Sequence, residues 1–143
     1  MSETGNILIV DDDEIICNTL RRDLGRLGFH CATAAGGLDA MAQLRETDFD
    51  VVLTDLNMPG MDGIELLRQM QETGIRAVPI MLSGSKQVSQ AIEASQRGAF
   101  DFMEKPTKMD KVRQVIARAL KHRRVVRHAQ AMSDLAGPAV TNE

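Results

Sequence analysis

The chain has 143 residues, of which 43% are hydrophobic and 26% charged, and its formal net charge is −3. This length fits one domain, and the composition is typical of a soluble globular protein rather than a disordered or fibrous one. No apolar run approaches the roughly 18 residues of a membrane span, and the first apolar run is too short for a secretory signal. Cys17 and Cys31 are too few for a disulfide framework, so we expect a cytoplasmic protein with reduced thiols and no membrane contact.

The charge is unevenly distributed along the chain. Residues 1–104 carry 17 acidic and 8 basic side chains, whereas residues 105–143 carry 3 acidic and 9 basic ones. This division favours an acidic site in the body of the protein and a basic helix or tail at its end. The chain has no Trp or Tyr and four Phe, which gives little support for stacking on bases. Direct nucleic-acid binding is therefore not expected.

Short apolar runs alternate with longer segments of helical periodicity. Strands are predicted, in chain order, over 6–10, 29–34, 50–54, 78–82 and 99–103. The helices between and after them are predicted over 16–27, 38–44, 64–70, 88–95 and 109–120. This alternation predicts a doubly wound α/β fold, with a five-stranded parallel sheet and helices on both faces. In such a sheet a ligand site lies beyond the carboxyl ends of the strands.

The last helix is followed by a basic segment, 121–128, and by small polar residues from Ser133 onward. We therefore divide the chain into a domain over 5–122 and, over 123–143, a basic helix extension with a flexible tail or linker. The basic segment has three interpretations: a solvated helix end, a connector to an output domain or dimer seam, and a nucleic-acid contact. Five positions of the helix keep the 3–4 spacing of a seam: Val112, Ile116, Ala119, Arg123 and Val126.

Polar side chains follow four of the five predicted strands. They are Asp11, Asp12 and Asp13 after the first, Asp55 after the third, Ser83 after the fourth, and Lys105 shortly after the fifth. Clustered carboxylates without His or Cys suit Mg²⁺. A phosphoryl group would then bridge the cation and Lys105, with Ser83 as hydrogen-bond donor. Asp55 is the candidate nucleophile, because carboxylates form aspartyl phosphates.

Four sequence motifs occur in a specific order and at compatible spacing. They are Ile-Leu-Ile-Val-Asp-Asp-Asp at 7–13, Asp-Leu-Asn-Met-Pro-Gly-Met-Asp-Gly at 55–63, Met-Leu-Ser-Gly at 81–84 and Lys-Pro at 105–106. Together they resemble the receiver domain of two-component response regulators, over residues 5–122. The resemblance implies a flavodoxin-like (βα)5 fold. It also implies that Asp55 accepts a phosphoryl group from the phosphohistidine of a sensor histidine kinase or phosphotransfer protein.

The resemblance further implies a metal site and a phosphoryl-binding lysine. Asp11 and Asp12 would hold Mg²⁺, with Asp12 the more direct ligand, together with Asp55 and the backbone carbonyl of Asn57. Lys105 would bind the phosphoryl group, and the Lys105–Pro106 peptide would be cis.

The resemblance also implies a conformational switch that involves two further residues. Ser83 would be the hydroxyl that moves toward the phosphoryl group, and Phe102 the aromatic residue that turns inward with it. Ser83 stands where Thr is commoner, Gly84 where Ala is usual, and Phe102 lacks the hydroxyl of a Tyr. The inward rotamer of Phe102 would therefore be held by packing alone.

By this resemblance the chain is a signalling module rather than a metabolic enzyme, with only its own phosphorylation and dephosphorylation as chemistry. It would control an output domain or partner protein through the face of the fourth helix, fifth strand and fifth helix, with a homodimer as a further option.

An alternative also starts from the first strand. The pattern Asp11-x-Asp13 resembles haloacid-dehalogenase-like phosphohydrolases, in which Asp11 would be the nucleophile. Ile15 stands where that family has Thr or Val, and the chain is short for a cap domain. The two hypotheses differ in the aspartate that carries the phosphoryl group.

Overall fold

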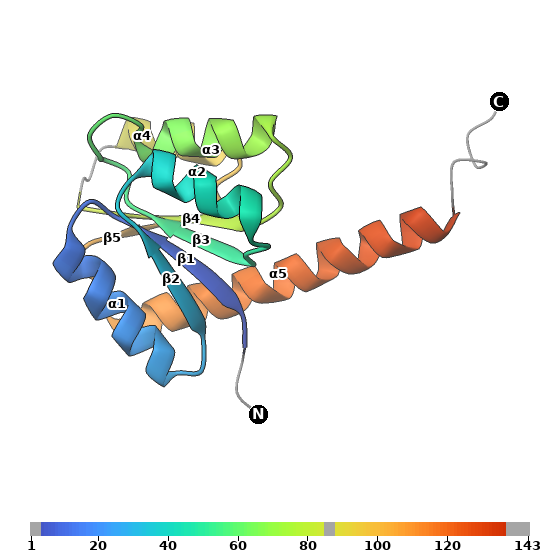
Figure 1. The fold of residues 1–143 in the computed structure, drawn as a ribbon, viewed down its shortest axis with the longest axis horizontal. Helices are drawn as coiled ribbons and strands as arrows, with labels where there is room; N and C mark the ends of the chain where they lie inside the picture. Colours follow the sequence, from blue (N-terminus) through green and yellow to red (C-terminus); the bar gives the residue numbers. More distant parts are fainter. Residues whose placement is uncertain (1–3, 85–87, 137–143) are drawn as a thin grey trace.

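The computed structural model describes residues 4–84 and 88–136, in which strands and helices alternate (Figure 1). The elements are β1 (Asn6–Val10), α1 (Glu14–Arg26), β2 (His30–Ala34), α2 (Gly37–Glu46), β3 (Val51–Thr54), α3 (Gly63–Glu72), β4 (Val78–Ser83), α4 (Val88–Gln96), β5 (Asp101–Glu104) and α5 (Met109–Ala136). The strands form one parallel sheet in the order β2-β1-β3-β4-β5. This is the order of flavodoxin-like proteins, so the predicted fold class is confirmed.

Helices cover both faces of the sheet, with α1 and α5 on one face and α2, α3 and α4 on the other (Figure 1). Successive strand residues point to opposite faces, which supplies two separate cores. Ile7 and Ile9 of β1 pack with α1 and α5, whereas Leu8 and Val10 of the same strand pack with α2 and α3. The three inner strands, β1, β3 and β4, are buried on both sides, which explains why they appear in the sequence as continuous apolar runs.

The start of β5 differs from the prediction. The apolar run at 99–103 predicted a strand from residue 99, but β5 begins at Asp101. Gly98 adopts a φ of 93°, and the backbone N–H of Ala99 donates to the carbonyl of Ala94 over 2.9 Å. Ala99 therefore caps the C-terminus of α4, and β5 begins after it.

Helix α5 is longer than predicted. It continues without a break past residue 122 to Ala136, so residues 133–136, which we assigned to a tail, are helical. The rest of that tail, 137–143, lies outside the described residues. Val112, Ile116 and Ala119 are at most 1% exposed and belong to the core beneath the sheet. The 3–4 pattern thus marks the face of α5 that packs on the sheet rather than an exposed dimer seam.

The described ranges contain no helix with the length and apolar character needed to cross a bilayer.

Candidate functional site

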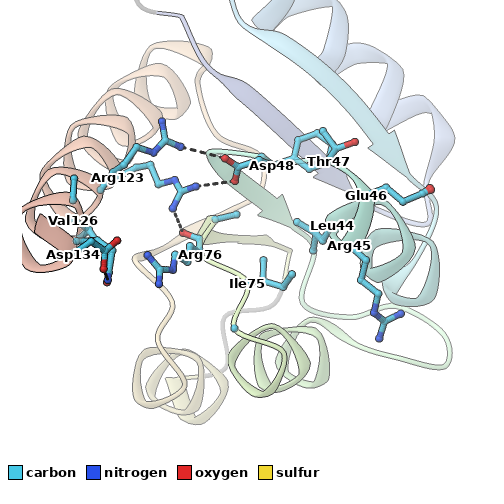
Figure 2. Close-up of a pocket in the computed structure, with 16 residues that line it drawn as sticks. Leu44, Arg45, Glu46, Thr47, Asp48, Ile75, Arg76, Arg123, Val126 and Asp134 are labelled. Atoms are coloured by element: carbon cyan, nitrogen blue, oxygen red, sulfur yellow. Dashed lines mark hydrogen bonds and ion pairs between the residues drawn. The ribbon is translucent and has the colours of Figure 1, made fainter. Parts of the chain in front are cut away.

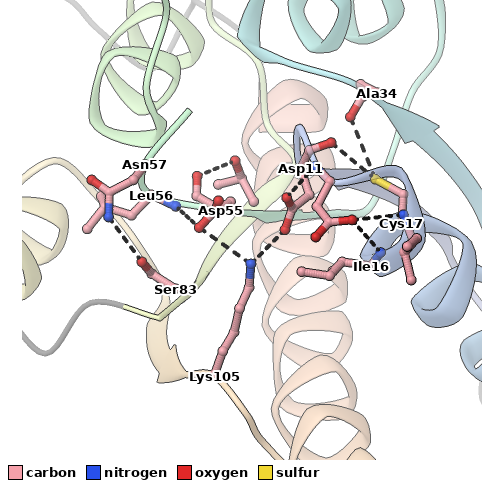
Figure 3. A network of polar contacts seen from close by, with 12 residues as sticks. Asp11, Ile16, Cys17, Ala34, Asp55, Leu56, Asn57, Ser83 and Lys105 are labelled. Atoms are coloured by element: carbon pink, nitrogen blue, oxygen red, sulfur yellow. Dashed lines mark hydrogen bonds and ion pairs between the residues drawn. The ribbon is translucent and has the colours of Figure 1, made fainter. Parts of the chain in front are cut away.

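The candidate site lies where β1 and β3 end side by side (Figure 3). Val10 is in register with Thr54, so Asp11 and Asp55 leave the sheet at the same level. The N–H of Asp55 donates to the Val10 carbonyl over 2.8 Å, which extends the ladder to the site. From β1 the chain continues to β2 on one side of β1, and then crosses to β3 and β4 on the other side. The site therefore occupies the point where the strand order reverses, which is the usual ligand position in such sheets.

Three carboxylates meet at this edge. Asp11, Asp12 and Asp55 each offer an oxygen within 4.8 Å of the others, and Asp11 is buried, Asp55 half-buried and Asp12 exposed. The ammonium of Lys105 lies 2.7 Å from Asp11 Oδ2 and 3.6 Å from Asp55 Oδ1. Three carboxylates and one ammonium leave a formal charge of −2, and oxygen donors of this kind suit a hard divalent cation.

The environment of Asp55 disfavours its ionised form. Burial raises the pKa of Asp55 above its usual range, and the neighbouring Asp11 acts in the same direction. Lys105 and the N–H of Leu56, which donates to Asp55 Oδ1 over 2.9 Å, oppose that shift. The Asp55 carboxylate is thus partly desolvated, and a further positive charge beside it would stabilise its ionised form.

Asp13 serves the helix rather than the acidic cluster. Its Oδ1 accepts from the backbone N–H groups of Ile15 at 2.9 Å and Ile16 at 3.4 Å, which caps the N-terminus of α1. The thiol of Cys17 donates to the Asp11 carbonyl over 3.3 Å and holds the first turn of α1 against the site. Asp13 is not among the predicted metal ligands. Its capping role and the contact of Cys17 with Asp11 were not predicted from the sequence.

Ser83 and Lys105 belong to neighbouring strand ends. The side chain of Ser83 is buried at the end of β4, and the Ser83 carbonyl accepts from the N–H of Lys105 over 2.8 Å. The Lys105–Pro106 peptide is cis, as predicted. Asn57 Nδ2 lies 3.5 Å from Ser83 Oγ, and Gln90 of α4 reaches Asn57 Oδ1 over 3.5 Å. Gln90, which no sequence motif identified, therefore connects α4 to this edge.

Phe102 lies farther from the acidic cluster. It stands opposite Met81 in the β4–β5 register and is half-buried. Its described packing is with an apolar cluster on the α3 and α4 side of the sheet, formed by Leu56, Leu67, Met81 and Ala94. The structure thus places Asp11, Asp12, Asp55 and Lys105 in one group, joins Ser83 to it through Asn57, and puts Phe102 in the adjoining apolar layer.

Gly63, at the start of α3, passes close beneath Asp55. A Cβ at this position would lie 2.5 Å from the Asp55 carbonyl oxygen and 2.9 Å from Leu56 Cα. The N–H of Gly63 donates to the Leu56 carbonyl over 2.8 Å. No sequence pattern identifies this close approach, which appears only in the fold.

Comparison with known proteins identifies a family and several relatives that agree with one another. Residues 7–117 match the family described as the response regulator receiver domain. The chain is 39% identical over 120 residues to the transcriptional regulatory protein ZraR of Salmonella typhimurium, and 35% identical over 120 residues to the DNA-binding transcriptional regulator NtrC of the same organism. These alignments cover 83% and 84% of this chain but only 27% and 26% of the relatives, so the chain spans about a quarter of their length.

A solved structure agrees with these matches. The crystal structure of FixJ-N superposes with a TM-score of 0.79 at 34% identity, covering 85% of this chain and 97% of that one. These likenesses give no support to the haloacid-dehalogenase alternative. The chain belongs to the receiver domain family of two-component response regulators.

Proposed function

We propose that the chain is a Mg²⁺-dependent phosphoacceptor in which Asp55 takes a phosphoryl group from the phosphohistidine of a sensor histidine kinase or phosphotransfer protein. The observation that carries the proposal is the group formed by Asp11, Asp12 and Asp55 with the Lys105 ammonium, 2.7 Å from Asp11. Mg²⁺ would be held by these carboxylates and the backbone carbonyl of Asn57, and when bound it supplies positive charge for the phosphoryl oxygens.

The transfer itself needs little more than orientation and charge. An Asp55 carboxylate oxygen attacks phosphorus and forms an acyl phosphate, while the bond from phosphorus to the histidine nitrogen breaks and its electron pair returns to the imidazole. Lys105, already 3.6 Å from Asp55 Oδ1, neutralises charge on the transferred group. Ser83 donates its hydroxyl to a phosphoryl oxygen.

The response would pass from Ser83 to the face made by α4, β5 and α5. Phe102 of β5 packs against the apolar cluster that contains Leu56 and Met81, so its inward rotation would alter the packing of this face. Ile92 of α4 is 53% exposed and offers an apolar contact there. An output domain or partner protein binding this face would then select one of two conformations.

The proposed chemistry ends with phosphorylation and autodephosphorylation of the chain itself. It includes no metabolic substrate and no direct contact with nucleic acid. A cytoplasmic location fits this role, because the phosphodonor would be an intracellular kinase.

The proposal is tested by incubating the protein with acetyl phosphate, with and without Mg²⁺, and recording its intact mass. We expect one added phosphoryl group that requires Mg²⁺ and is removed by hydroxylamine, as an acyl phosphate is. Asp55→Asn should abolish the addition, whereas Asp39→Asn, which changes an exposed carboxylate on α2, should not.

Some receivers react only with a protein donor, so beryllofluoride provides the second arm. Bound with Mg²⁺, it mimics the phosphoryl group and should raise the melting temperature of the wild type but not of Asp55→Asn. Labelling that survives in Asp55→Asn would overturn the proposal, as would a wild type that neither labels nor responds to beryllofluoride.

A further inference from the structure

Four charged side chains meet at the edge of the sheet opposite the phosphoacceptor. Figure 2 shows two of them, Arg123 and Asp48. Arg123 and Arg127 come from α5, whereas Asp48 and Asp50 come from the segment between α2 and β3. We call this group the α5 latch. Asp50 immediately precedes β3 and Asp55 immediately follows it, so the latch and the candidate site lie at the two ends of the central strand.

Arg123 is the buried member of the α5 latch. Its side chain is only 6% exposed, although it lies in the basic segment that the sequence suggests is solvated. Arg123 Nη2 donates to Asp48 Oδ1 over 2.8 Å, and its Nε lies 3.8 Å from Asp50 Oδ1. Nη1 donates to the backbone carbonyl of Arg76, between α3 and β4, over 3.2 Å. One guanidinium thus contacts two separate connections of the sheet.

Arg127, one turn later, extends the same contacts. It lies 3.1 Å from Asp50 Oδ1 and 3.6 Å from Asp48 Oδ2. The other oxygen of Asp50 accepts from the N–H of Asn6 at the start of β1 over 2.9 Å. Through these bonds α5 is joined to the starts of both β1 and β3.

After Arg123, the described part of α5 has little apolar packing. The large apolar side chains there are exposed: Val125 by 60%, Val126 by 40%, Met132 by 54% and Leu135 by 80%. The helix accordingly projects away from the sheet (Figure 1). The last buried side chain of α5 among the described residues is Arg123. The direction of the projecting part therefore depends on its continuity with the packed first half of α5 and on polar contacts with defined geometry, rather than on a hydrophobic face of its own.

We propose that the α5 latch is a conformational device that fixes the direction of the projecting part of α5, 124–136, relative to the sheet. A buried ion pair contributes modest net stability, because desolvation offsets most of the attraction, but the fork of a guanidinium restricts the orientation of its partners. The latch acts on helix direction in the unphosphorylated chain, so it stands independently of the phosphoacceptor proposal.

The proposal is tested by a distance measurement on the full chain. Ala42→Cys on α2 and Ser133→Cys on α5 place spin labels at two exposed positions, in a background with Cys17→Ser and Cys31→Ser. Double electron–electron resonance then gives the distribution of distances between the labels. We expect a narrow distribution in this background and one broadened about twofold or more by Arg123→Met, because the helix can then pivot.

Two further variants make the result decisive. Lys121→Met removes a charge from an exposed position of the same helix and should leave the distribution narrow. Asp48→Ala removes the side-chain oxygens of one of the two aspartates that contact both arginines, and Asp48 is 76% exposed, so this variant decides the question if Arg123→Met does not fold. A lower melting temperature with an unchanged, narrow distribution would mean that the latch only stabilises the fold, and would overturn the proposal.

Discussion

At the scale of single residues, the fold and the proposed chemistry have opposite effects on the ionisation of Asp55. A nucleophilic carboxylate must be ionised, yet burial and the adjacent Asp11 raise its pKa. Lys105 offsets part of this cost, being 3.6 Å from Asp55 Oδ1 and 2.7 Å from Asp11 Oδ2. The acidic cluster is therefore a source of instability in the metal-free protein, which indicates a role other than holding the fold together.

Replacing this carboxylate should stabilise the metal-free protein. We expect Asp55→Asn to increase the free energy of unfolding at pH 7, in EDTA, by about 1 kcal/mol, because the amide carries no charge to desolvate or repel Asp11. Chemical denaturation followed by circular dichroism measures the difference.

The pH dependence of this gain has a defined sign. The pKa of Asp55 is higher in the folded protein than in the unfolded chain, so stability linked to its proton is complete below the unfolded pKa and is lost as pH rises through the folded pKa. The advantage of Asp55→Asn should therefore shrink as pH falls toward and below the ordinary carboxyl pKa. A variant that is less stable than the wild type at pH 7 would contradict this account.

At the scale of elements, the strands were predictable and some ends were not. β1 is the apolar run 6–10 itself, and the other strands shift by one or two residues. β5 begins two residues later than predicted because the N–H of Ala99 donates to the last turn of α4. The αL conformation of Gly98 makes this cap possible. In α5, Arg123 is buried through partners about 75 positions earlier in the chain, and helical periodicity contains no information about such contacts.

The start of α3 provides a test of the close approach at Gly63. Gly63→Ala should destabilise the fold by about 2 kcal/mol or more, because its Cβ would meet the Asp55 carbonyl and the backbone of Leu56. Gly25→Ala in α1 is the matched control. Nothing lies within 4 Å of its Cβ, and an alanine there should stabilise the helix by about 0.5–1 kcal/mol.

Urea unfolding of both variants measures these changes. If the two substitutions shift stability by the same amount and in the same direction, the approach of α3 to Asp55 is not as tight as described.

At the scale of the whole molecule, the topology of the sheet made the proximity of the strand-end residues predictable. A parallel sheet brings all strand ends to one edge, so locating Asp11, Asp55 and Lys105 in the sequence was enough to predict their proximity. The contact of Gln90 with Asn57 depends on how α4 packs, and no sequence pattern identifies it. The predicted boundary after residue 122 falls immediately before Arg123, which is buried against the domain.

Shortening the chain tests that boundary. A chain ending after residue 122 loses both arginines of the α5 latch and leaves Asp50, 19% exposed, without these cations. We expect its free energy of unfolding to fall by about 1–3 kcal/mol. A chain ending after residue 130 keeps both arginines and should match the full chain. Equal stability of the two shortened chains would support the predicted boundary at residue 122.

The central claim is that Asp55 carries the phosphoryl group, and the most direct measurement locates that group. After reaction with a phosphodonor and Mg²⁺, borohydride reduces an aspartyl phosphate to homoserine, which tandem mass spectrometry of the peptides can assign to one position. We expect homoserine at position 55 and unmodified aspartate at positions 11 and 12. Homoserine at position 11 with aspartate retained at position 55 would contradict this claim.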